Sequence, residues 1–272
     1  MSEGKINEHI LIWNSAYRDN WEHNNAGCAV GYPTHHWLSD TLSFAVKSVT
    51  LTNMFPNVYG QNAILWFKER EDQNDVHSCV VVPNQHVETV EELASLIQAC
   101  LDSTFTVGWA AVTVNADGYI VITSVTNDYL VFLTQQEVYR ETGNRTSMNL
   151  LMGMNSNMVV KDNVVPLIMP DKPNLTGVRK VRISTTMGAS SNSIHPSGDI
   201  GDMITSLSLH DVDFGFSKTY EYDSSENARH IFEGNRDCSR LDIFLHDEYD
   251  QILELPENAP VDIEFTVTSR TT

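Results

Sequence analysis

The clearest pattern of apolar and polar positions along the chain lies near the C-terminus, in residues 240–269. Apolar side chains recur at every second position in residues 241–245 and again in residues 261–267, and Ile252 lies between the two runs. Alternation with a period of two is typical of strands that place one face on a core. Acidic and proline-containing segments separate the runs, which suits turns. We therefore predict three short strands joined by tight connections, with the last strand paired inside a sheet.

Segments rich in β-branched and aromatic residues extend this pattern over much of the chain. The further predicted strands are residues 42–54, 63–68, 78–82, 105–114, 119–124, 129–134, 178–184, 203–209, 218–222 and 228–232. Between two of them lies a strong signal for a hairpin turn, Asn115-Ala116-Asp117-Gly118. The sequence therefore predicts a mainly β fold.

One segment has the spacing of an amphipathic helix instead. In residues 87–103, apolar side chains recur at spacings of three and four, and three glutamates crowd the first turn. Thr89 and Glu92 have the spacing of a capping box. Because strand, helix, hairpin and strand follow one another here, we predict a small α/β unit over residues 83–154, inserted in an otherwise β chain.

The first 40 residues lack this regular pattern. They contain one short apolar patch, residues 10–13, and otherwise many Asn, His and Gly residues. Tryptophan is unusual in a segment exposed to solvent, yet this one contains Trp13, Trp21 and Trp37. We therefore predict an arm over residues 1–40 that docks on its own domain or on a neighbour.

The remaining chain divides around the predicted insertion. Residues 41–82 are predicted to form the first part of the β domain, and residues 155–272 its remaining strands. Within the second part, residues 186–202 are rich in Gly and Ser and are predicted to form a long exposed loop. At 272 residues, the chain is long enough to bury a sizeable core.

The chain is strongly acidic, with a formal net charge of −19. Contacts to nucleic acid or to an anionic membrane surface need clustered Lys and Arg, so we predict no direct nucleic-acid partner and no binding to such a membrane. A basic protein partner or bound divalent cations fit the sign of the charge, as does the ordinary need for solubility. No stretch approaches about 18 consecutive apolar residues, so we expect no membrane insertion.

The four cysteines are widely scattered and form no CxxC motif; they are Cys28, Cys79, Cys100 and Cys238. This pattern fits reduced, buried thiols in an intracellular chain better than a disulfide scaffold or a zinc site. We therefore predict free thiols in a chain that is made in the cytosol.

The sequence contains none of the common catalytic motifs. A GxSxG elbow, a phosphate-binding GxxxxGK[ST] loop, an HExxH zinc motif and a GxGxxG turn after a strand are all absent, and so is the histidine cluster of a cupin metal site. Glu91 and Glu92 are better explained as partners of the helix dipole than as a catalytic pair. We therefore predict that the protein is not an enzyme and has no catalytic or cofactor-binding residue.

Three histidine-containing groups are candidate metal ligands: His210-Asp211 with Asp213, His246-Asp247, and His35-His36. The first two follow predicted strands, where a solvated turn is the simpler interpretation, and the third lies in the predicted arm. A hard cation such as Ca²⁺ has a further candidate group in Asp199, Asp202, Asp211 and Asp213. Their spacing matches no Ca²⁺-binding loop, so a solvated acidic rim is favoured. We predict no metal site and keep Ca²⁺ as the alternative.

Three dispersed stretches carry a family resemblance. One is the run CVVVPNQHVETVEELASLIQACLDS with the VTVNADGYIVITS that follows it, and the second is LLMGM. The third is NLTGVRKVRIST, which leads past the long loop to LDIFLHDEYDQILEL and VDIEFTV. In the order of these elements, the chain from Phe44 to Phe265 resembles the penton (minor capsid) proteins of virophages, polinton-like viruses and adintoviruses. It differs from their usual pattern in having Met154 in place of an aromatic residue and no Gly in the turn after Asp250.

The resemblance implies a fold, an assembly and a location. The fold is a mainly β, single jelly-roll sandwich with a small inserted α/β unit. The assembly is a homopentamer at the five-fold vertices of an icosahedral capsid, next to a double-jelly-roll major capsid protein. The protein would be made in the host cytoplasm or a virus factory and would then lie at the capsid vertex of the virion. Two alternatives are a receptor-binding head of a virion spike, which would use residues 186–202, and a cupin-like or lectin-like binding protein.

Overall fold

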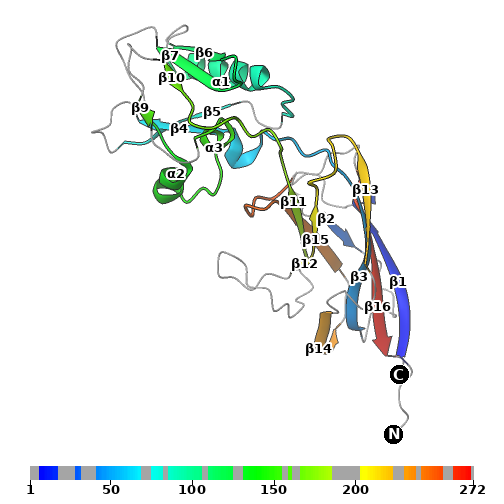
Figure 1. Ribbon diagram of the computed structural model, residues 1–272. Helices are drawn as coiled ribbons and strands as arrows, with labels where there is room; N and C mark the ends of the chain where they lie inside the picture. The colour runs from blue at the N-terminus through cyan, green and yellow to red at the C-terminus, as the bar shows by residue number, and fades with distance from the viewer. Residues whose placement is uncertain are drawn as a thin grey trace. The chain divides into compact units, whose positions relative to one another are not determined.

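A computed structural model of the chain shows two compact units (Figure 1). We call Met1–Phe55 together with Val178–Thr272 the sandwich unit, and Pro56–Gly177 the inserted unit. The structure describes residues 6–17, 28–31, 41–68, 75–81, 85–105, 110–124, 131–154, 159–160, 166–185, 203–222, 230–236, 240–253 and 260–270.

The described part of the sandwich unit consists mainly of strands. They are β1 (Ile6–Asn14), β2 (Cys28–Gly31), β3 (Thr41–Thr52), β11 (Lys180–Thr185), β12 (Met203–Ser208), β13 (Ser217–Glu221), β14 (His230–Arg236), β15 (Arg240–His246) and β16 (Asp262–Arg270). One sheet has the order β1-β16-β3-β13, with β14 also paired to β3, and the other has the order β12-β11-β15-β2. All of these pairs are antiparallel.

The strand order identifies this unit as a jelly roll. Without β14, the strands follow one another along the unit as β1, β2, β3, β11, β12, β13, β15 and β16. The first strand, β1, pairs with the last, β16, and the second strand, β2, pairs with β15. The third strand, β3, lies in the sheet of β1, and the fourth, β11, lies in the sheet of β2. This winding of two four-stranded sheets is the arrangement of a jelly roll. The predicted fold class, mainly β with a jelly-roll sandwich, is therefore confirmed.

The core of the sandwich unit lies on the inward faces of the two sheets. Along β16, Ile263, Phe265 and Val267 are buried, while the residues between them are partly exposed. The ring of Phe265 meets that of Phe44 on β3 edge-on, with the centroids 6.0 Å apart. Ile243 on β15 is buried on the other sheet. The alternation in the C-terminal sequence therefore predicted the facing of both strands, and β16 lies inside its sheet, between β1 and β3.

The structure does not confirm two predictions for the sandwich unit, the strand around Ile252 and the loop at residues 186–202. The middle strand of the predicted C-terminal meander does not form, because Ile252 makes only an isolated bridge with His246. The structure therefore has two strands there, joined by a turn. The predicted loop at residues 186–202 lies outside the described residues.

The described parts of residues 1–40 lie on their own domain, as one form of the prediction had it, but they are strands of the sandwich unit and not a separate arm. β1 pairs with β16 along its whole length, from Ile6 opposite Arg270 to Asn14 opposite Asp262. Trp13 is fully buried, and β2 pairs with β15. The sequence pattern did not predict β1, because both faces of this strand are apolar in residues 10–13. The alternation that marks a half-buried strand is therefore absent there. Trp21 and Trp37 lie outside the described residues.

Deletion of residues 1–40 is therefore expected to unfold the sandwich unit rather than to remove a detachable arm. The deletion takes away the strand that pairs with β16 and leaves the space of the buried Trp13 side chain empty. Circular dichroism and thermal unfolding of the truncated chain measure the loss. Deletion of residues 1–5, which precede β1, is the control and should leave the melting temperature unchanged. A truncation at residue 40 that still melts like the full chain would contradict the role of β1.

The inserted unit contains three helices and two small sheets among its described residues. The helices are α1 (Val90–Thr104), α2 (Gln135–Thr142) and the single turn α3 (Met148–Leu151), and a 3₁₀ turn lies at Gly60–Ala63. One sheet has the order β5-β4-β8-β9, and the other has the order β10-β7-β6. The strands are β4 (Ile64–Lys68), β5 (His77–Val80), β6 (Ala110–Val114), β7 (Ile120–Ser124), β8 (Val131–Phe132), β9 (Val159–Val160) and β10 (Leu167–Ile168).

The insertion is wider than the predicted residues 83–154. β4 and β5 were predicted as jelly-roll strands, but β4 pairs with β8, which lies far along the insertion. This pairing moves both strands into the inserted unit. Predictions that depend on neighbouring residues alone are confirmed. Thr89 and Glu92 form the capping box of α1. In the hairpin between β6 and β7, the Asn115 side chain accepts hydrogen bonds from the main-chain N–H groups of Asp117 and Tyr119. The predictions omitted α2 and α3.

Two of the four cysteines are joined, so the prediction of free thiols is wrong for them. Cys79 on β5 and Cys100 on α1 form a disulfide with their Cα atoms 6.2 Å apart. The two residues are 21 positions apart in the chain, and only the packing of the helix against the strand brings them together. A spacing of this size gives no sequence signal of pairing. Cys28 lies on β2, and Cys238 lies outside the described residues.

Candidate functional site

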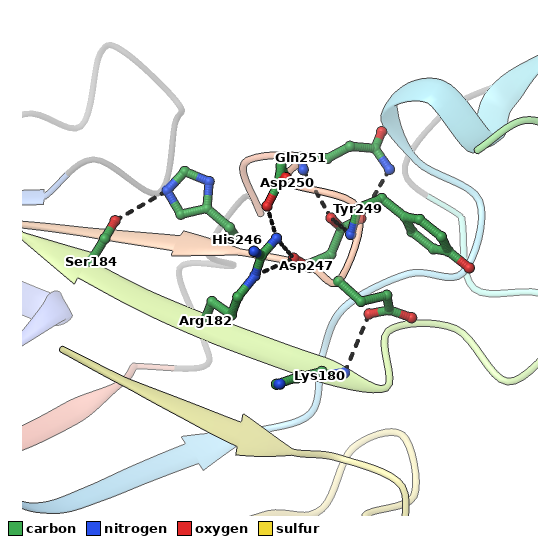
Figure 2. Close-up of polar contacts among 9 residues, drawn as sticks. Lys180, Arg182, Ser184, His246, Asp247, Tyr249, Asp250 and Gln251 are labelled. Carbon is green, nitrogen blue, oxygen red and sulfur yellow. Dashed lines mark hydrogen bonds and ion pairs between the residues drawn. The ribbon is translucent and has the colours of Figure 1, made fainter. Parts of the chain in front are cut away.

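A compact group of polar contacts surrounds the turn that follows β15, residues 247–251, which we call the acidic turn (Figure 2). Asp247 is fully buried. Its Oδ1 accepts hydrogen bonds from the main-chain N–H groups of Tyr249 and Gln251, each at 2.8 Å, and its Oδ2 accepts one from the Gln251 side-chain amide at 2.9 Å. A buried carboxylate needs donors of this kind. Asp247 therefore closes the turn by bonding to its main chain.

Arg182 on β11 connects the acidic turn to the sheet (Figure 2). Its Nε and Nη2 donate to the main-chain oxygen of Asp247 at 3.2 and 2.8 Å, and its guanidinium forms an ion pair with Asp250. Asp250 has a φ of 70°, and Asp is one of the few residues other than Gly that adopt this left-handed conformation without large strain. The ion pair thus involves the residue that reverses the chain.

Two further contacts bind this region to β11. The Glu248 carboxylate accepts hydrogen bonds from the main-chain N–H groups of Arg179 and Lys180, with a shortest distance of 3.3 Å, and His246 Nε2 lies 3.2 Å from Ser184 Oγ. Burial, followed by the nearby Glu248 carboxylate, raises the pKa of the Tyr249 hydroxyl. These contacts hold main chain and side chains in place. Asp247 is therefore a buried structural acid, whereas the sequence had placed His246-Asp247 in a solvated turn.

The other histidine–aspartate candidate lies at the surface of the sandwich unit. His210, Asp211 and Asp213 are all exposed. Lys218 Nζ donates to Asp211 at 2.7 Å, and this hydrogen bond is the main cause that lowers the pKa of the Asp211 carboxyl. An exposed ion pair of this kind contributes little to stability.

Glu91 and Glu92 lie in the exposed first turn of α1. The Glu92 carboxylate accepts from the main-chain N–H groups of Glu88 and Thr89 at 2.9 and 3.2 Å, and these bonds, the one from Glu88 first, lower its pKa. Its role here is that of a helix cap.

Two buried asparagines hold main chain in the inserted unit, and the sequence patterns missed both. Asn57 donates to the carbonyl oxygens of Val87 and Leu175 and accepts from the N–H of Val87, at 2.8–2.9 Å. Asn149 similarly bonds both main-chain groups of Trp66 and the carbonyl oxygen of Leu133, at 2.7–2.9 Å. A buried amide with matched partners fixes loops that apolar contacts alone would not position.

The described residues contain no group of three or more His, Cys, Asp or Glu side chains placed to hold a metal ion. His35, His36, Asp199 and Asp202 lie outside the described residues, so the Ca²⁺ alternative stays a prediction. Among the helices of the described chain, none has the length and apolar character needed to cross a bilayer.

Three exposed isoleucines lie on the outward face of β1, together with the exposed Glu8 between the first two of them. Ile6, Ile10 and Ile12 all point away from the core, with 64%, 59% and 60% of their surface exposed. β1 is the outermost described strand of its sheet (Figure 1). The outward face of the same sheet is polar elsewhere, where Lys47 pairs with Glu264 at 3.1 Å and Thr50 bonds to Thr219 at 2.9 Å. We call these three residues the isoleucine row.

No family model matches the chain, and no curated protein does. Among solved structures, the chain is similar to the mavirus penton protein, with 12% identity and a TM-score of 0.44 over 98% of this chain and 100% of that one. It is also similar to a chain in the cryo-EM structure of the Sputnik virophage, with 10% identity and a TM-score of 0.41 over 98% of each chain.

Proposed function

We propose that the protein is a structural subunit of a virion, the penton that forms homopentamers at the five-fold vertices of an icosahedral capsid. The observation that carries this proposal is the jelly-roll order of the sandwich unit, with β1 paired to β16 and β2 to β15. The jelly roll is the building unit of many capsids, although lectins and cupins also use it. The sequence resemblance of residues 44–265 to penton proteins favours the capsid among these.

The proposed ring is held by contacts between different faces of neighbouring subunits. A cyclic assembly with five copies needs two unlike surfaces on each subunit, since only a two-fold axis brings a surface against itself. The isoleucine row is well suited to be one of these surfaces, because burying it removes apolar area from water. In the capsid, a double-jelly-roll major capsid protein would surround the ring.

Charge opposes this assembly. Five chains of −19 each carry 5 × −19 = −95, so the subunits repel one another at long range. Salt screens such repulsion with a Debye length of about 8 Å at physiological ionic strength. We therefore expect pentamers to be favoured by raised salt or by Ca²⁺, and monomers to persist in dilute low-salt buffer.

Sedimentation or native mass spectrometry across a series of salt, Ca²⁺ and chelator concentrations tests the proposal. The expected result is a pentamer whose fraction rises with salt. In the double variant Ile10→Lys with Ile12→Lys, the pentamer should be lost even though two added positive charges reduce the repulsion. Thr50→Lys, which adds a positive charge on the polar part of the same sheet face, is the control and should assemble at least as readily as the wild type.

A chain that stays monomeric at every concentration and salt would contradict the penton function. A trimer would favour the receptor-binding head of a spike instead. If the wild type forms pentamers and the lysine double variant does so equally well, the ring stands but the isoleucine row is not part of its interface.

A further inference from the structure

The Cys79–Cys100 disulfide lies at a junction inside the inserted unit. Cys79 belongs to β5, which is an outermost described strand of the sheet β5-β4-β8-β9. Cys100 belongs to α1, and Gln98 of that helix donates to the carbonyl oxygen of Ala110 at 2.8 Å and accepts from the N–H of Val112 at 2.7 Å on β6. The helix is therefore attached to the other sheet, β10-β7-β6. The disulfide thus joins one sheet to a helix that is attached to the second.

β5 has few other attachments among the described residues. It pairs with β4, and the His77 ring stacks on that of Phe67 at 6.0 Å. Val80 is 63% exposed, so the outward face of the strand makes little packing contact. The inward face holds Cys79, with 6% of its surface exposed, against Cys100, with 3% exposed. The covalent bond is therefore a main connection between this edge strand and the helix.

We infer that the disulfide is a redox-dependent lock on the inserted unit, open as two thiols in a reducing cytosol and closed in an oxidising medium. This inference does not rest on the proposed capsid function. Cysteine pairs in chains made in the cytosol are normally kept reduced, and they oxidise when the protein reaches a more oxidising medium. The lock would then strengthen the inserted unit after the protein has left the compartment in which it was made.

The closing reaction needs an oxidant, and a small disulfide such as oxidised glutathione supplies it. The thiolate of one cysteine attacks a sulfur of glutathione disulfide, forms a mixed disulfide and releases one glutathione thiolate. The thiolate of the second cysteine then attacks the protein sulfur and releases the other glutathione thiolate. Two electrons pass from the cysteines to glutathione, and the two protons that the cysteines lose are taken up by the released thiolates.

Because both cysteines are buried, the formation of the disulfide and its reduction each require β5 to separate locally from α1. Neither sulfur is accessible to glutathione or to a reductant while β5 stays packed on α1. The closed bond should therefore resist reductant in the folded protein and yield to it when the protein is unfolded. Because the bond also constrains the unfolded chain, its reduction should lower the melting temperature by about 10 °C.

The test uses the full chain, purified under reducing conditions and then incubated with oxidised and reduced glutathione. The probe is a maleimide added to the denatured protein without reductant, and the readout is the intact mass and the melting temperature. We expect two of the four cysteines to be protected from the maleimide after oxidation, and the melting temperature to rise. Cys28→Ser with Cys238→Ser, the control, should keep the full response, and Cys79→Ser with Cys100→Ser should lose it.

Two results would overturn the lock. One is the labelling of all four cysteines after oxidation, which would mean that the bond does not form. The other is a protected pair whose reduction leaves the melting temperature unchanged, which would mean that the bond locks nothing. The serine double variant keeps the test decisive even if it is less stable, since its response to glutathione is compared with its own reduced state.

Discussion

Replacement of Phe265 with aspartate is expected to unfold the sandwich unit. The side chain at this position is 1% exposed and meets the ring of Phe44 inside the jelly roll. A carboxylate there would be buried without a partner, at a cost of roughly 4 kcal/mol or more, which is a large part of the stability of an ordinary domain. Chemical denaturation followed by circular dichroism measures the change in the free energy of unfolding.

The matched control is Thr266→Asp, which places the same charge on the next residue of β16. Thr266 is partly exposed and lies opposite Ile10, on the outward face of the sheet. We expect a change within about 0.5 kcal/mol in the monomer, as for most surface substitutions. Equal losses at positions 265 and 266 would show that the facing of β16 is wrong.

Replacement of Gly153 with alanine is expected to disrupt the inserted unit. Gly153 has a φ of 104°, and an added Cβ would lie 2.1 Å from the main-chain oxygen of Asp171. Asp171 cannot simply move away, because its N–H donates to the carbonyl oxygen of Gly153 at 3.1 Å. Overlap with main chain, together with the unfavourable φ, should destabilise the unit by roughly 3 kcal/mol or more.

Gly143→Ala separates the two contributions to this loss. Gly143 ends α2 with a φ of 79°, but its Cβ position has no atom within 4 Å. Only the left-handed conformation then opposes alanine, at a cost of about 1 kcal/mol. Thermal unfolding of the two variants should rank Gly153→Ala well below Gly143→Ala. Similar melting temperatures would mean that Asp171 does not approach Gly153 closely.

Sequence patterns predicted the strands whose two faces differ, and failed where they do not. β15, the second half of β3 and the first half of β16 have one buried and one partly exposed face, so alternation located these strands. β1 escaped notice because its outward face carries the isoleucine row opposite the buried Leu11 and Trp13. A strand that is apolar on both faces has no period of two. The isoleucine row, which we propose as an assembly surface, is therefore also the reason why the sequence pattern did not predict the first strand of the fold.

The helix α2 had a signal that the predictions did not use. Thr134 and Glu137 form a capping box at its start, and Gly143 ends it in the left-handed conformation. Its apolar content is low, with Val138 as its buried residue. A search for apolar periodicity therefore passed over it, whereas a search for cap residues would have found it.

The acidic turn could be predicted only in part. The polar run after β15 indicated a turn, but the roles of Asp247 and Asp250 depend on Arg182, more than sixty residues earlier in the chain. Only the antiparallel pairing of β11 with β15 brings the arginine to the turn. Contacts over such separations, like the Cys79–Cys100 bond, follow from the fold and leave no local mark in the sequence.

The pairing of β1 with β16 has a practical consequence for labelling. Ile6 lies opposite Arg270, so the first and last described residues are neighbours at one end of the sheet (Figure 1). The other end of the sheet holds Asn14, Asp262 and Thr52, and just beyond Thr52 the chain leaves for the inserted unit. A fluorescent protein or an affinity tag fused to either terminus would therefore report on the same pole of the sandwich unit. A tag in the turn at residues 213–216, which is mostly exposed and bonds to Asn53 next to Thr52, would mark the opposite pole. The pair of tags would then show which pole is accessible in any assembly that the protein forms.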